Sequence, residues 1–338
     1  MELNVKNRHS DYDLAQMQSL PLSAKIRMSK QRIEQWYDHW NGEVYASVSG
    51  IDSSVMKHLI DSMYDDVPAL YVNTGLEYIE LQRFWREVKN GKYNCFNSDV
   101  EIVRPEMRFD EVIKKYGYPL LSKESANNIE YGRKALERGD ELKVDRYVNG
   151  RRLNKKTGEV YYYGGLSKLG KKIFYSDIPV SNKCCTIMKK NPAKKYEKET
   201  GRKAFIGTQA EESKSREMWW KRNGCNAFNK QRPTSQPLSF WTKQDILEYA
   251  RLYNVPYPEA YGDIIEISET IDRLDGEHTK LKTSGCERTG CMFCAFGVQC
   301  EGNPNRFQKM KDTHPKQYDY CMNDLGMGKI LDFMEIER

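Results

Sequence analysis

The chain has 338 residues, of which 30% are charged, and a formal net charge of +6 at pH 7. A chain of this length can bury a sizeable core as one large domain with an appendage or as two domains. No apolar run approaches the roughly 18 residues that span a bilayer, and the polar N-terminus lacks the apolar segment of a signal peptide. From these features we expect a cytoplasmic protein that neither spans a membrane nor is secreted. The mild positive charge is compatible with a nucleotide or nucleic-acid partner and requires neither.

The N-terminal segment, residues 1–41, is polar with an amphipathic stretch at residues 24–40. Within that stretch, Ile26, Ile33 and Trp36 recur at helical spacing. The pattern predicts a helix that packs on the main sheet or in an oligomer contact, so a homodimer is a further expectation.

A strand, a short turn and a helix start follow one another in residues 44–59. The β-branched run enters a turn at Ser49 and Gly50, and a helical apolar pattern begins after Asp52. A helix start presents unpaired backbone N–H groups and the positive end of the helix dipole, and glycine leaves room for a phosphate. The hydroxyls of Ser49 and Ser53 are additional donors. The stretch predicts a phosphate site, with an ordinary turn capped by Asp or Ser as the alternative.

The order of strand, loop and helix recurs downstream. Residues 69–73 have the pattern of a buried parallel strand, and residues 79–88 that of a helix. The loop between them holds Thr74, Gly75 and Glu77 at the carboxyl end of the strand, where open α/β sheets bind ligands.

A third strand is predicted at residues 100–103 and a helix at residues 109–116. Lys123, which follows them, is a candidate phosphate contact, with a solvated surface lysine as the alternative. The repeated alternation of strand and helix predicts an α/β fold.

The alternation weakens at residues 130–172, where a highly charged segment leads into a hairpin pattern. Strands are predicted at residues 145–153 and 159–163, around a turn at residues 156–158. We interpret the segment as an insertion over the sheet. Its cations and tyrosines suit nucleic acid through charge and stacking, with a solvated hairpin as the alternative. These side chains are Arg151, Arg152, Lys155, Lys156, Tyr161, Tyr162 and Tyr163.

The nine cysteines are an odd number, and several lie too close together in sequence for a disulfide framework. In a reducing compartment, clustered cysteines indicate metal binding or redox chemistry. Cys184 and Cys185 are adjacent, and Lys189 with its neighbouring lysines would lower the pKa of both thiols. Cys291 and Cys294 have the spacing with which two thiolates grip one metal ion or two corners of a cluster. The spacing alone does not separate zinc from iron–sulfur.

A further short strand is predicted at residues 204–208, before a segment rich in acidic and basic residues. A helix start capped by Thr208, with Glu211 and Glu212 in its first turn, is the plain structural interpretation. Arg216 suits an oxyanion because its planar guanidinium offers several donors.

Two features mark the last third of the chain. Thr242 and Asp245 have the spacing of a capping box and predict a helix that ends before Pro256. Cys321 then lies close to the C-terminal end, before an amphipathic helical pattern. Cys321 is a candidate nucleophile if its surroundings lower its pKa, and a buried thiol without a chemical role is the alternative.

Several of these segments together resemble one superfamily. The sequence SGIDS at residues 49–53 resembles the Ser-Gly-Gly-x-Asp-Ser pyrophosphatase loop of the adenine nucleotide alpha hydrolase superfamily, one glycine shorter and with Ile51 where many members carry lysine. The TGLEY sequence at residues 74–78 and the EESKSRE sequence at residues 211–217 resemble the phosphoadenosine phosphosulfate (PAPS) reductase branch. The resemblance spans residues 44–296. It implies a doubly wound, mostly parallel sheet with helices on both faces.

The sequence patterns and the resemblance together predict a domain plan. Residues 1–41 form a helical segment, residues 42–270 a nucleotide-binding α/β domain with a hairpin insertion at about residues 130–172, and residues 271–338 a cysteine-rich region that completes an iron–sulfur site.

Site residues are carried over from the same resemblance. Asp52 and Arg216 fall at catalytic positions, and Cys321 is the nucleophile if the chain is a reductase. The implied ligand is ATP, PAPS or adenylyl sulfate, with Mg²⁺ near Asp52 if ATP is used. The implied nucleotide contacts are Ser47, Ser49, Gly50, Asp52, Ser53, Thr74, Gly75, Glu77, Lys123, Gly207, Thr208, Glu212, Ser213 and Arg216.

The cysteine pattern resembles the ligand set of the [4Fe-4S]-bearing adenylyl sulfate and phosphoadenylyl sulfate reductases. Cys286 and Cys300 flank the second pair and are substitute ligands. The resemblance implies a [4Fe-4S] cluster held by Cys184, Cys185, Cys291 and Cys294.

Three functions are open on this basis. The first is ATP-dependent sulfur transfer. A substrate oxygen attacks the α-phosphate of ATP, pyrophosphate leaves, and sulfur then displaces AMP. The expected sulfur donor is a cysteine desulfurase, and the acceptor is a nucleic acid or a metabolite. The second is reduction of PAPS or adenylyl sulfate to sulfite by Cys321 and a thioredoxin-like reductant, although the tail lacks the Cys-Gly motif of the family's reductases. The third is a nucleic-acid-binding module with structural zinc.

Overall fold

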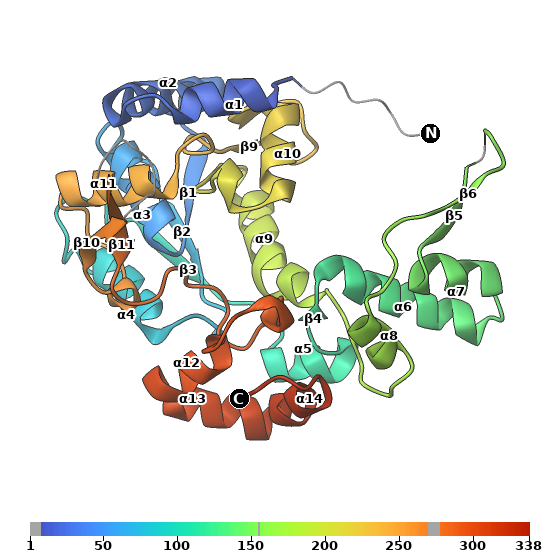
Figure 1. Cartoon of the computed structure of the whole chain (residues 1–338). Helices are drawn as coiled ribbons and strands as arrows, with labels where there is room; N and C mark the ends of the chain where they lie inside the picture. Colours follow the sequence, from blue (N-terminus) through green and yellow to red (C-terminus); the bar gives the residue numbers. More distant parts are fainter. Residues whose placement is uncertain (1–7, 155, 270–277) are drawn as a thin grey trace. The chain divides into compact units, whose positions relative to one another are not determined.

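The computed structural model describes residues 8–154, 156–269 and 278–338. The chain divides into two compact units (Figure 1). Unit 1 comprises Met1–Asn73, Glu77–Arg104 and Ala193–Thr289, and unit 2 comprises Thr74–Leu76, Pro105–Pro192 and Gly290–Arg338. This division differs from the expected domain plan, because the inserted segment and the cysteine-rich C-terminal region belong to the same unit.

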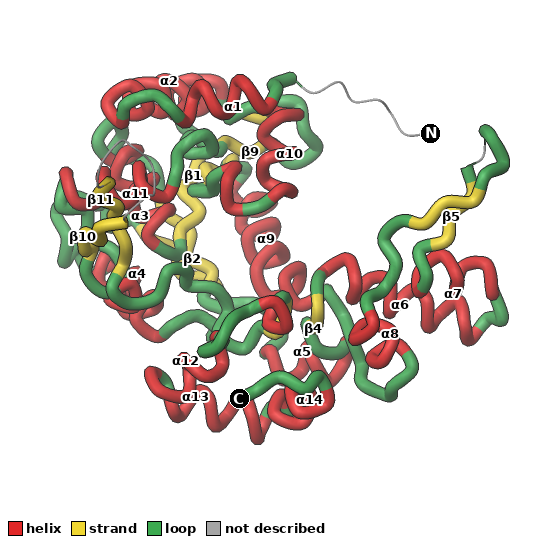
Figure 2. The backbone as a smooth tube through the Cα atoms, in the orientation of Figure 1, coloured by secondary structure: helices red, strands yellow, loops and turns green. Residues whose placement is uncertain are grey.

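A six-stranded sheet forms the centre of unit 1, with the order β3-β2-β1-β7-β9-β8. All neighbouring strands are parallel except β8 and β9. Because β1 lies between β2 and β7, the loop after β1 is at the switch point of the sheet, where open α/β sheets bind ligands. Figure 2 shows strands of this sheet in yellow among the red helices. The strands are β1 Val44–Val48, β2 Ala69–Val72, β3 Val100–Val103, β7 Lys203–Ile206, β8 Asn226–Ala227 and β9 Thr234–Ser235.

Helices cover both faces of this sheet. On β1, Val44, Ala46 and Val48 point into a large core with α2, α3, α4 and α11, whereas Tyr45 points into a smaller core with α9. This alternation is what a strand between two helical layers requires. The predicted doubly wound, mostly parallel sheet is confirmed. The helices of unit 1 are α1 Asp11–Gln18, α2 Leu22–His39, α3 Ile51–Asp61, α4 Ile79–Lys89, α9 Asn191–Thr200, α10 Lys214–Asn223 and α11 Lys243–Leu252.

A buried carboxylate fixes the start of α11. Asp245 accepts the Thr242 N–H at 2.6 Å, and its own N–H donates to Thr242 Oγ1 at 3.3 Å, so the predicted capping box is confirmed. The same carboxylate accepts a hydrogen bond from Lys25 Nζ on α2 at 2.6 Å, with both side chains less than 10% exposed. One carboxylate therefore caps α11 and joins it to α2.

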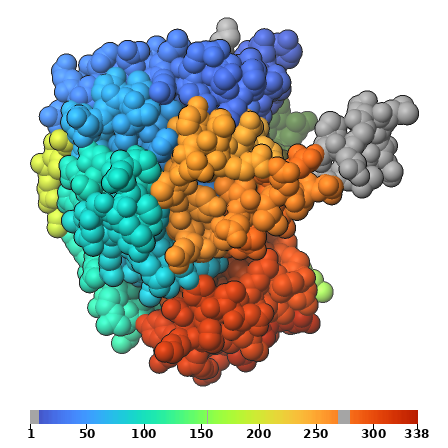
Figure 3. Space-filling view, turned by 90° about the vertical axis from the view of Figure 1, so that its left-hand side faces the viewer, coloured from blue at the N-terminus to red at the C-terminus, as the bar shows by residue number. Residues whose placement is uncertain are grey.

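The hairpin of β10 (Ile264–Glu269) and β11 (His278–Thr283) packs next to α11. Gln244 on α11 fixes this hairpin with two hydrogen bonds to the Leu281 backbone, at 2.8 and 2.9 Å. In the space-filling view, the orange surface around α11 lies beside the cyan surface of α4 (Figure 3). An exposed ion pair of 3.2 Å joins these two surfaces between Arg83 and Glu259.

Unit 2 combines short strand pairs with helices. The β4–β12 pair is parallel and joins residue 120 to the cysteine-rich region, and β5–β6 is an antiparallel hairpin. Its elements are β4 Leu120–Leu121, β5 Arg151–Leu153, β6 Val160–Tyr162, β12 Ala295–Phe296, α5 Phe109–Tyr116, α6 Lys123–Glu137, α7 Glu141–Val148, α8 Lys168–Phe174, α12 Arg306–Thr313, α13 Pro315–Asp319, α14 Met327–Phe333 and the π-helices η1 Thr186–Lys190 and η5 Tyr320–Asp324.

The largest difference from the expected elements lies before the hairpin. Residues 145–148 belong to helix α7 and not to a strand. Asp140 caps this helix by accepting the Lys143 N–H at 3.1 Å, and Gly139, with a φ of +67°, ends α6 just before it. Among the described helices, none is long and apolar enough to cross a membrane.

Candidate functional site

The loop after β1 is held in shape by a buried serine. Ser53 Oγ accepts the Ser49 N–H and donates to the Gly50 carbonyl, both at 2.7 Å. The indole N–H of Trp85 donates to the Ser49 carbonyl at 2.7 Å. Ser53 is 7% exposed, so its hydroxyl organises the loop from inside, while Ser47 on β1 is half-buried. The backbone at the start of α3, with Gly50 as its N-cap, is therefore the part of the loop that best suits an anion.

Two hydroxyl groups cover Gly50. A Cβ added at Gly50 would lie 2.1 Å from Tyr261 Oη and 2.7 Å from Thr289 Oγ1. These two oxygens are hydrogen-bonded at 2.8 Å. Tyr261 is 2% exposed, and burial, together with the negative charge of Asp52, raises the pKa of its phenol. Tyr261 therefore stays protonated, and a group bound at the loop would meet two neutral hydroxyls.

The end of β7 packs tightly against the same loop. A Cβ at Gly207 would lie 2.9 Å from Ser53 Cα and 3.1 Å from the Asp52 carbonyl oxygen, so only glycine allows this close approach. Next to it, Thr208 Oγ1 donates to Gln236 Oε1 at 3.0 Å. The structure thus brings together Gly207 and the loop, two segments predicted to share a site.

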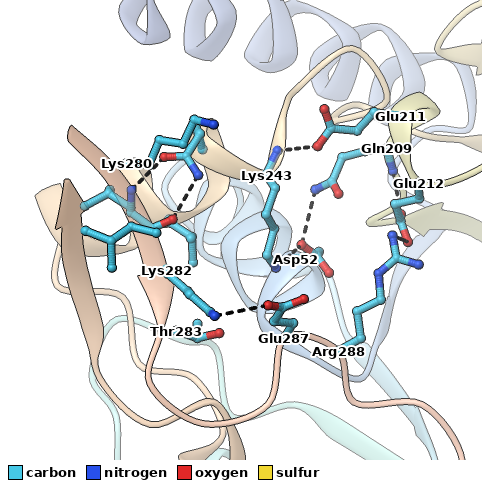
Figure 4. Close-up of a pocket in the computed structure, with 14 residues that line it drawn as sticks. Asp52, Gln209, Glu211, Glu212, Lys243, Lys280, Lys282, Thr283, Glu287 and Arg288 are labelled. Atoms are coloured by element: carbon cyan, nitrogen blue, oxygen red, sulfur yellow. Dashed lines mark hydrogen bonds and ion pairs between the residues drawn. The ribbon is translucent and has the colours of Figure 1, made fainter. Parts of the chain in front are cut away.

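A cavity of about 340 Å³ opens beside the loop (Figure 4). This volume lies within the usual range for small-molecule sites, about 300–1,000 Å³. Its walls come from the start of α3, the segment after β7, the start of α11, the β10–β11 hairpin and the loop after it. The lining residues are Asp52, Gln209, Glu211, Glu212, Lys243, Gln244, Leu247, Ile267, Lys280, Leu281, Lys282, Thr283, Glu287 and Arg288.

Asp52 joins the two sides of this cavity. Its Oδ1 accepts hydrogen bonds from Gln209 Nε2 and from Lys243 Nζ, both at 3.3 Å. The backbone N–H of Lys243 in turn donates to Glu211 Oε1 at 2.5 Å, and burial raises the pKa of Glu211. Lys243 is therefore a cation held next to the loop, with Asp52 as its counter-charge.

Arg216 is paired inside unit 1. Its guanidinium contacts the Glu212 carboxylate, which also lies 4.0 Å from Arg288. Ser213 caps α10 and accepts the Arg216 N–H at 3.3 Å. An oxyanion that binds Arg216 must therefore compete with Glu212 for the guanidinium.

Four residues of this site were not singled out in the sequence. Lys243, Gln209, Tyr261 and Thr289 reach the loop from segments far from it in the chain. The sequence points weakly to three of them. Gln209 directly follows the predicted nucleotide contact Thr208, and Lys243 is the first residue of a predicted helix. Tyr261 is the last residue of PYPEAY, residues 256–261, which resembles a Pro-Tyr-x-x-x-Tyr segment of the family, whereas nothing in the sequence marks Thr289.

The remaining predicted nucleotide contacts are divided between the units. Glu77 is buried in unit 1, whereas Thr74 and Gly75 belong to unit 2, where Thr74 Oγ1 accepts the Leu76 N–H at 3.2 Å. Lys123 is the first residue of α6 in unit 2, and its side chain is exposed. The loop and cavity described above are complete within unit 1.

Unit 2 brings four cysteines from two distant segments to one small cavity. Cys184, Cys185, Cys291 and Cys294 all line it, together with apolar residues and Lys189. The first two cysteines directly precede the π-helix η1, a feature that is frequent at functional sites. These are the four thiols that the resemblance predicts as cluster ligands.

The electrostatics around these thiols differ from expectation in one respect. Burial, and then the neighbouring thiols of Cys291, Cys185 and Cys294, raise the pKa of Cys184, and the opposing effect of Lys189 is smaller. The prediction that lysines lower this pKa is therefore wrong in its net direction. A bound metal would supply the positive charge that the lysines do not.

The other cysteines do not line this cavity. Cys286 belongs to unit 1, Cys300 is exposed, and all nine cysteines, which lie in the described residues, are free of disulfides. Within residues 8–154, 156–269 and 278–338, no group of three or more His, Cys, Asp or Glu side chains has the arrangement of a metal site.

Cys321 is fully buried in unit 2, in the π-helix η5. Burial raises the pKa of its thiol to about 12, so it stays protonated at neutral pH. We expect Cys321 in the folded protein to react with iodoacetamide at least about tenfold more slowly than the exposed Cys300, because alkylation requires an accessible thiolate. Peptide mass spectrometry after timed alkylation measures both rates, and equal rates would contradict the burial of Cys321.

Comparison with known proteins gives one family. The model of the phosphoadenosine phosphosulfate reductase domain matches residues 43–159 and 153–296, a range that contains the loop and the four clustered cysteines and ends before Cys321. No curated protein matches the chain. Among solved structures, the chain is similar to a phosphoadenylyl-sulfate (PAPS) reductase from Candida auris in complex with phosphate. The two sequences are 14% identical, the match covers 74% of this chain and 90% of that chain, and the TM-score is 0.38.

Proposed function

We propose that this chain, which belongs to the phosphoadenosine phosphosulfate reductase domain family, catalyses ATP-dependent sulfur transfer through an adenylated intermediate. Membership of the family makes it an enzyme of nucleotide-dependent sulfur chemistry. The observation that carries the proposal is the loop between β1 and α3, with the charged cavity of about 340 Å³ beside it. A loop at a sheet's switch point and a helix N-terminus suit the phosphates of a nucleotide.

In the proposed reaction, an acceptor oxygen attacks the α-phosphorus of ATP. The bond between that phosphorus and the bridging oxygen breaks, and pyrophosphate leaves with its electron pair. The backbone at Gly50 and the ammonium of Lys243 would bind the phosphate charge, while Asp52 would supply a carboxylate oxygen to Mg²⁺. A sulfur nucleophile then displaces AMP from the activated carbon.

The number and chemistry of the donors in unit 2 support an iron–sulfur cluster, and binding it would require the thiols to move into ligand geometry. Of the described residues, four thiols and no His, Asp or Glu line the cavity at η1, and four cysteines are the usual ligands of a [4Fe-4S] cluster. Cys184, Cys185, Cys291 and Cys294 would hold it, and such a cluster supplies a site for sulfide when bound. We place the reaction in the cytoplasm, where these thiols stay reduced.

Reduction of a sulfonucleotide is the second candidate, and the matching family favours it. This reaction needs a thiolate that attacks sulfur, and the burial of Cys321 gives that role no support. The two reactions have different products. Transfer releases pyrophosphate from ATP only with the acceptor present, and AMP only once the sulfur donor is added. Reduction instead releases sulfite from PAPS or adenylyl sulfate with a thioredoxin-like reductant.

Metal analysis tests the cofactor. After anaerobic purification we expect about four irons and four acid-labile sulfides per chain, with broad absorbance near about 400 nm. Cys291→Ser should lose at least about half of the iron, because it removes a thiolate from the proposed ligand set. Cys300→Ser, an exposed cysteine outside the cavity, is the matched control and should keep the full iron content.

One zinc and no sulfide per chain would contradict the cluster and would favour a structural metal. Equal iron loss in the two variants would contradict the ligand assignment while leaving the nucleotide chemistry open. The product assays for pyrophosphate and sulfite then test the reaction separately from the metal.

A further inference from the structure

One segment of unit 2, residues 123–174, is strongly basic. Residues 123–174 contain thirteen Lys and Arg and seven Asp and Glu, a net charge of +6. Residues 183–203 carry a further +6, which acidic residues elsewhere in the chain balance. The first segment comprises α6, α7, α8 and the β5–β6 hairpin. A basic segment of this kind suits a polyanionic partner.

The hairpin projects beyond the three helices of its own segment (Figure 1). Its base is fixed, because Gly150 and Gly165 pack so closely that a Cβ at Gly150 would lie 2.6 Å from the Gly165 nitrogen. Asn128 on α6 donates to the Gly164 carbonyl at 2.8 Å. The projecting strands are therefore anchored on the helices and not a loose loop.

Both faces of the hairpin carry exposed tyrosines next to cations. Arg151 pairs with Tyr162 in the strand register, and Arg152 pairs with Tyr161, so each arginine shares a face with a tyrosine. Tyr161, Tyr162 and Tyr163 are 49%, 70% and 66% exposed. The Arg152 guanidinium lies 5.4 Å from the centre of the Tyr163 ring, which holds the two planar groups near one another.

We infer that the β5–β6 hairpin binds single-stranded nucleic acid. Exposed aromatic rings cost free energy in water, and three in a row beside cations suit unpaired bases, whose faces stack on tyrosine while their phosphates contact Arg and Lys. A duplex keeps its bases stacked on one another and offers no such face. A protein partner would use the apolar Leu153 and Val160 and would not need the charge of the segment. This inference does not rest on the proposed reaction.

Binding can be measured on the full chain without ATP, by fluorescence anisotropy with labelled single strands of about 16 nucleotides. If Arg151, Arg152 and Lys156 each neutralise one phosphate, the affinity falls about twentyfold between about 50 and about 200 mM salt. We expect tighter binding to single strands than to a duplex of the same sequence. Separate DNA and RNA strands show which nucleic acid is preferred.

Three matched sets of variants test the two contributions. Replacing Tyr161, Tyr162 and Tyr163 by leucine keeps apolar surface but removes the aromatic faces, and should weaken binding at least about tenfold with an unchanged salt dependence. Replacing the same residues by phenylalanine should keep the affinity. The double variant Arg151→Gln/Lys156→Gln should instead reduce the salt slope by about 1.4.

Controls come from exposed positions elsewhere. Tyr12→Leu removes a tyrosine that is 74% exposed on α1, and Lys309→Gln/Lys316→Gln removes two exposed charges outside the segment. None of these should change binding by more than about twofold. The inference is overturned if single strands do not bind at about 50 mM salt, if duplex binds more tightly, or if the leucine variants bind as well as the phenylalanine variants. Melting temperatures show whether each variant is folded.

Discussion

Replacing Gly50 by alanine is expected to abolish measurable ATP binding and to lower the free energy of unfolding by about 2 kcal/mol. The new Cβ would lie 2.1 Å from Tyr261 Oη, and Tyr261 cannot move away because its ring is fully packed in the core. The φ of Gly50 is −91°, which alanine adopts without strain, so the effect is purely steric. Isothermal titration calorimetry and urea denaturation measure the two effects.

A second substitution identifies the atom responsible. Adding Tyr261→Phe to Gly50→Ala removes the closest contact and leaves Thr289 Oγ1 at 2.7 Å as the nearest atom. We expect the double variant to regain at least half of the lost stability, although Tyr261→Phe alone costs about 1 kcal/mol for its hydrogen bond to Thr289. Gly302→Ala is the matched control, because a Cβ there meets no atom within 4 Å. Tight ATP binding by Gly50→Ala would show that phosphates do not use this loop.

Breaking the buried ion pair between Lys25 and Asp245 is expected to cost about 3–5 kcal/mol of folding free energy. The variant Asp245→Asn keeps the shape of the side chain and an oxygen that can cap α11, but leaves the Lys25 ammonium without its counter-charge. Because the first turn of α11 carries Lys243, we also expect weaker nucleotide binding. Urea denaturation monitored by circular dichroism gives the change in stability.

The double variant Lys25→Met/Asp245→Asn separates two costs of breaking the pair: the lost attraction between the two charges, and the burial of a Lys25 ammonium without a counter-charge. It removes both charges, so it should be more stable than Asp245→Asn alone. The pair of Arg83 and Glu259 is the matched control, since both side chains are more than half exposed. Glu259→Gln should change the stability by less than about 1 kcal/mol. Equal effects of Asp245→Asn and Glu259→Gln would contradict a special role of burial.

Local patterns predict the elements well where burial and capping agree. The strand at residues 100–103 and the helix at residues 109–116 have the predicted bounds, and the capping box at Thr242 is present. The hairpin pattern predicts a strand from residue 145, but residues 145–148 are helical because Asp140 caps helix α7. Local propensity is weak wherever a cap or a tertiary contact opposes it.

The candidate site was predictable only in its local parts. The loop at Gly50 and the close approach of Gly207 follow from motifs in the sequence, and the four cysteines meet as the family resemblance implies. The contact of Lys243 with Asp52 joins residues 191 positions apart, and no periodicity or spacing encodes such a pair. Tyr261 belongs to a family-like segment, but its contact with Gly50, like that of Thr289, forms only once the sheet and its loops are packed.

The strand order of the central sheet also determines when this site can form. β1 pairs with β2 across about 20 residues of chain, but with β7 across about 160, since Val44 lies opposite Lys203. Closing the longer loop costs about 2 kcal/mol more in chain entropy. Long-range pairing of this kind slows folding. We therefore expect β1, and with it the Gly50 loop, to pair first with β2. The contact between the loop and Gly207 forms only after nearly two thirds of the chain has folded.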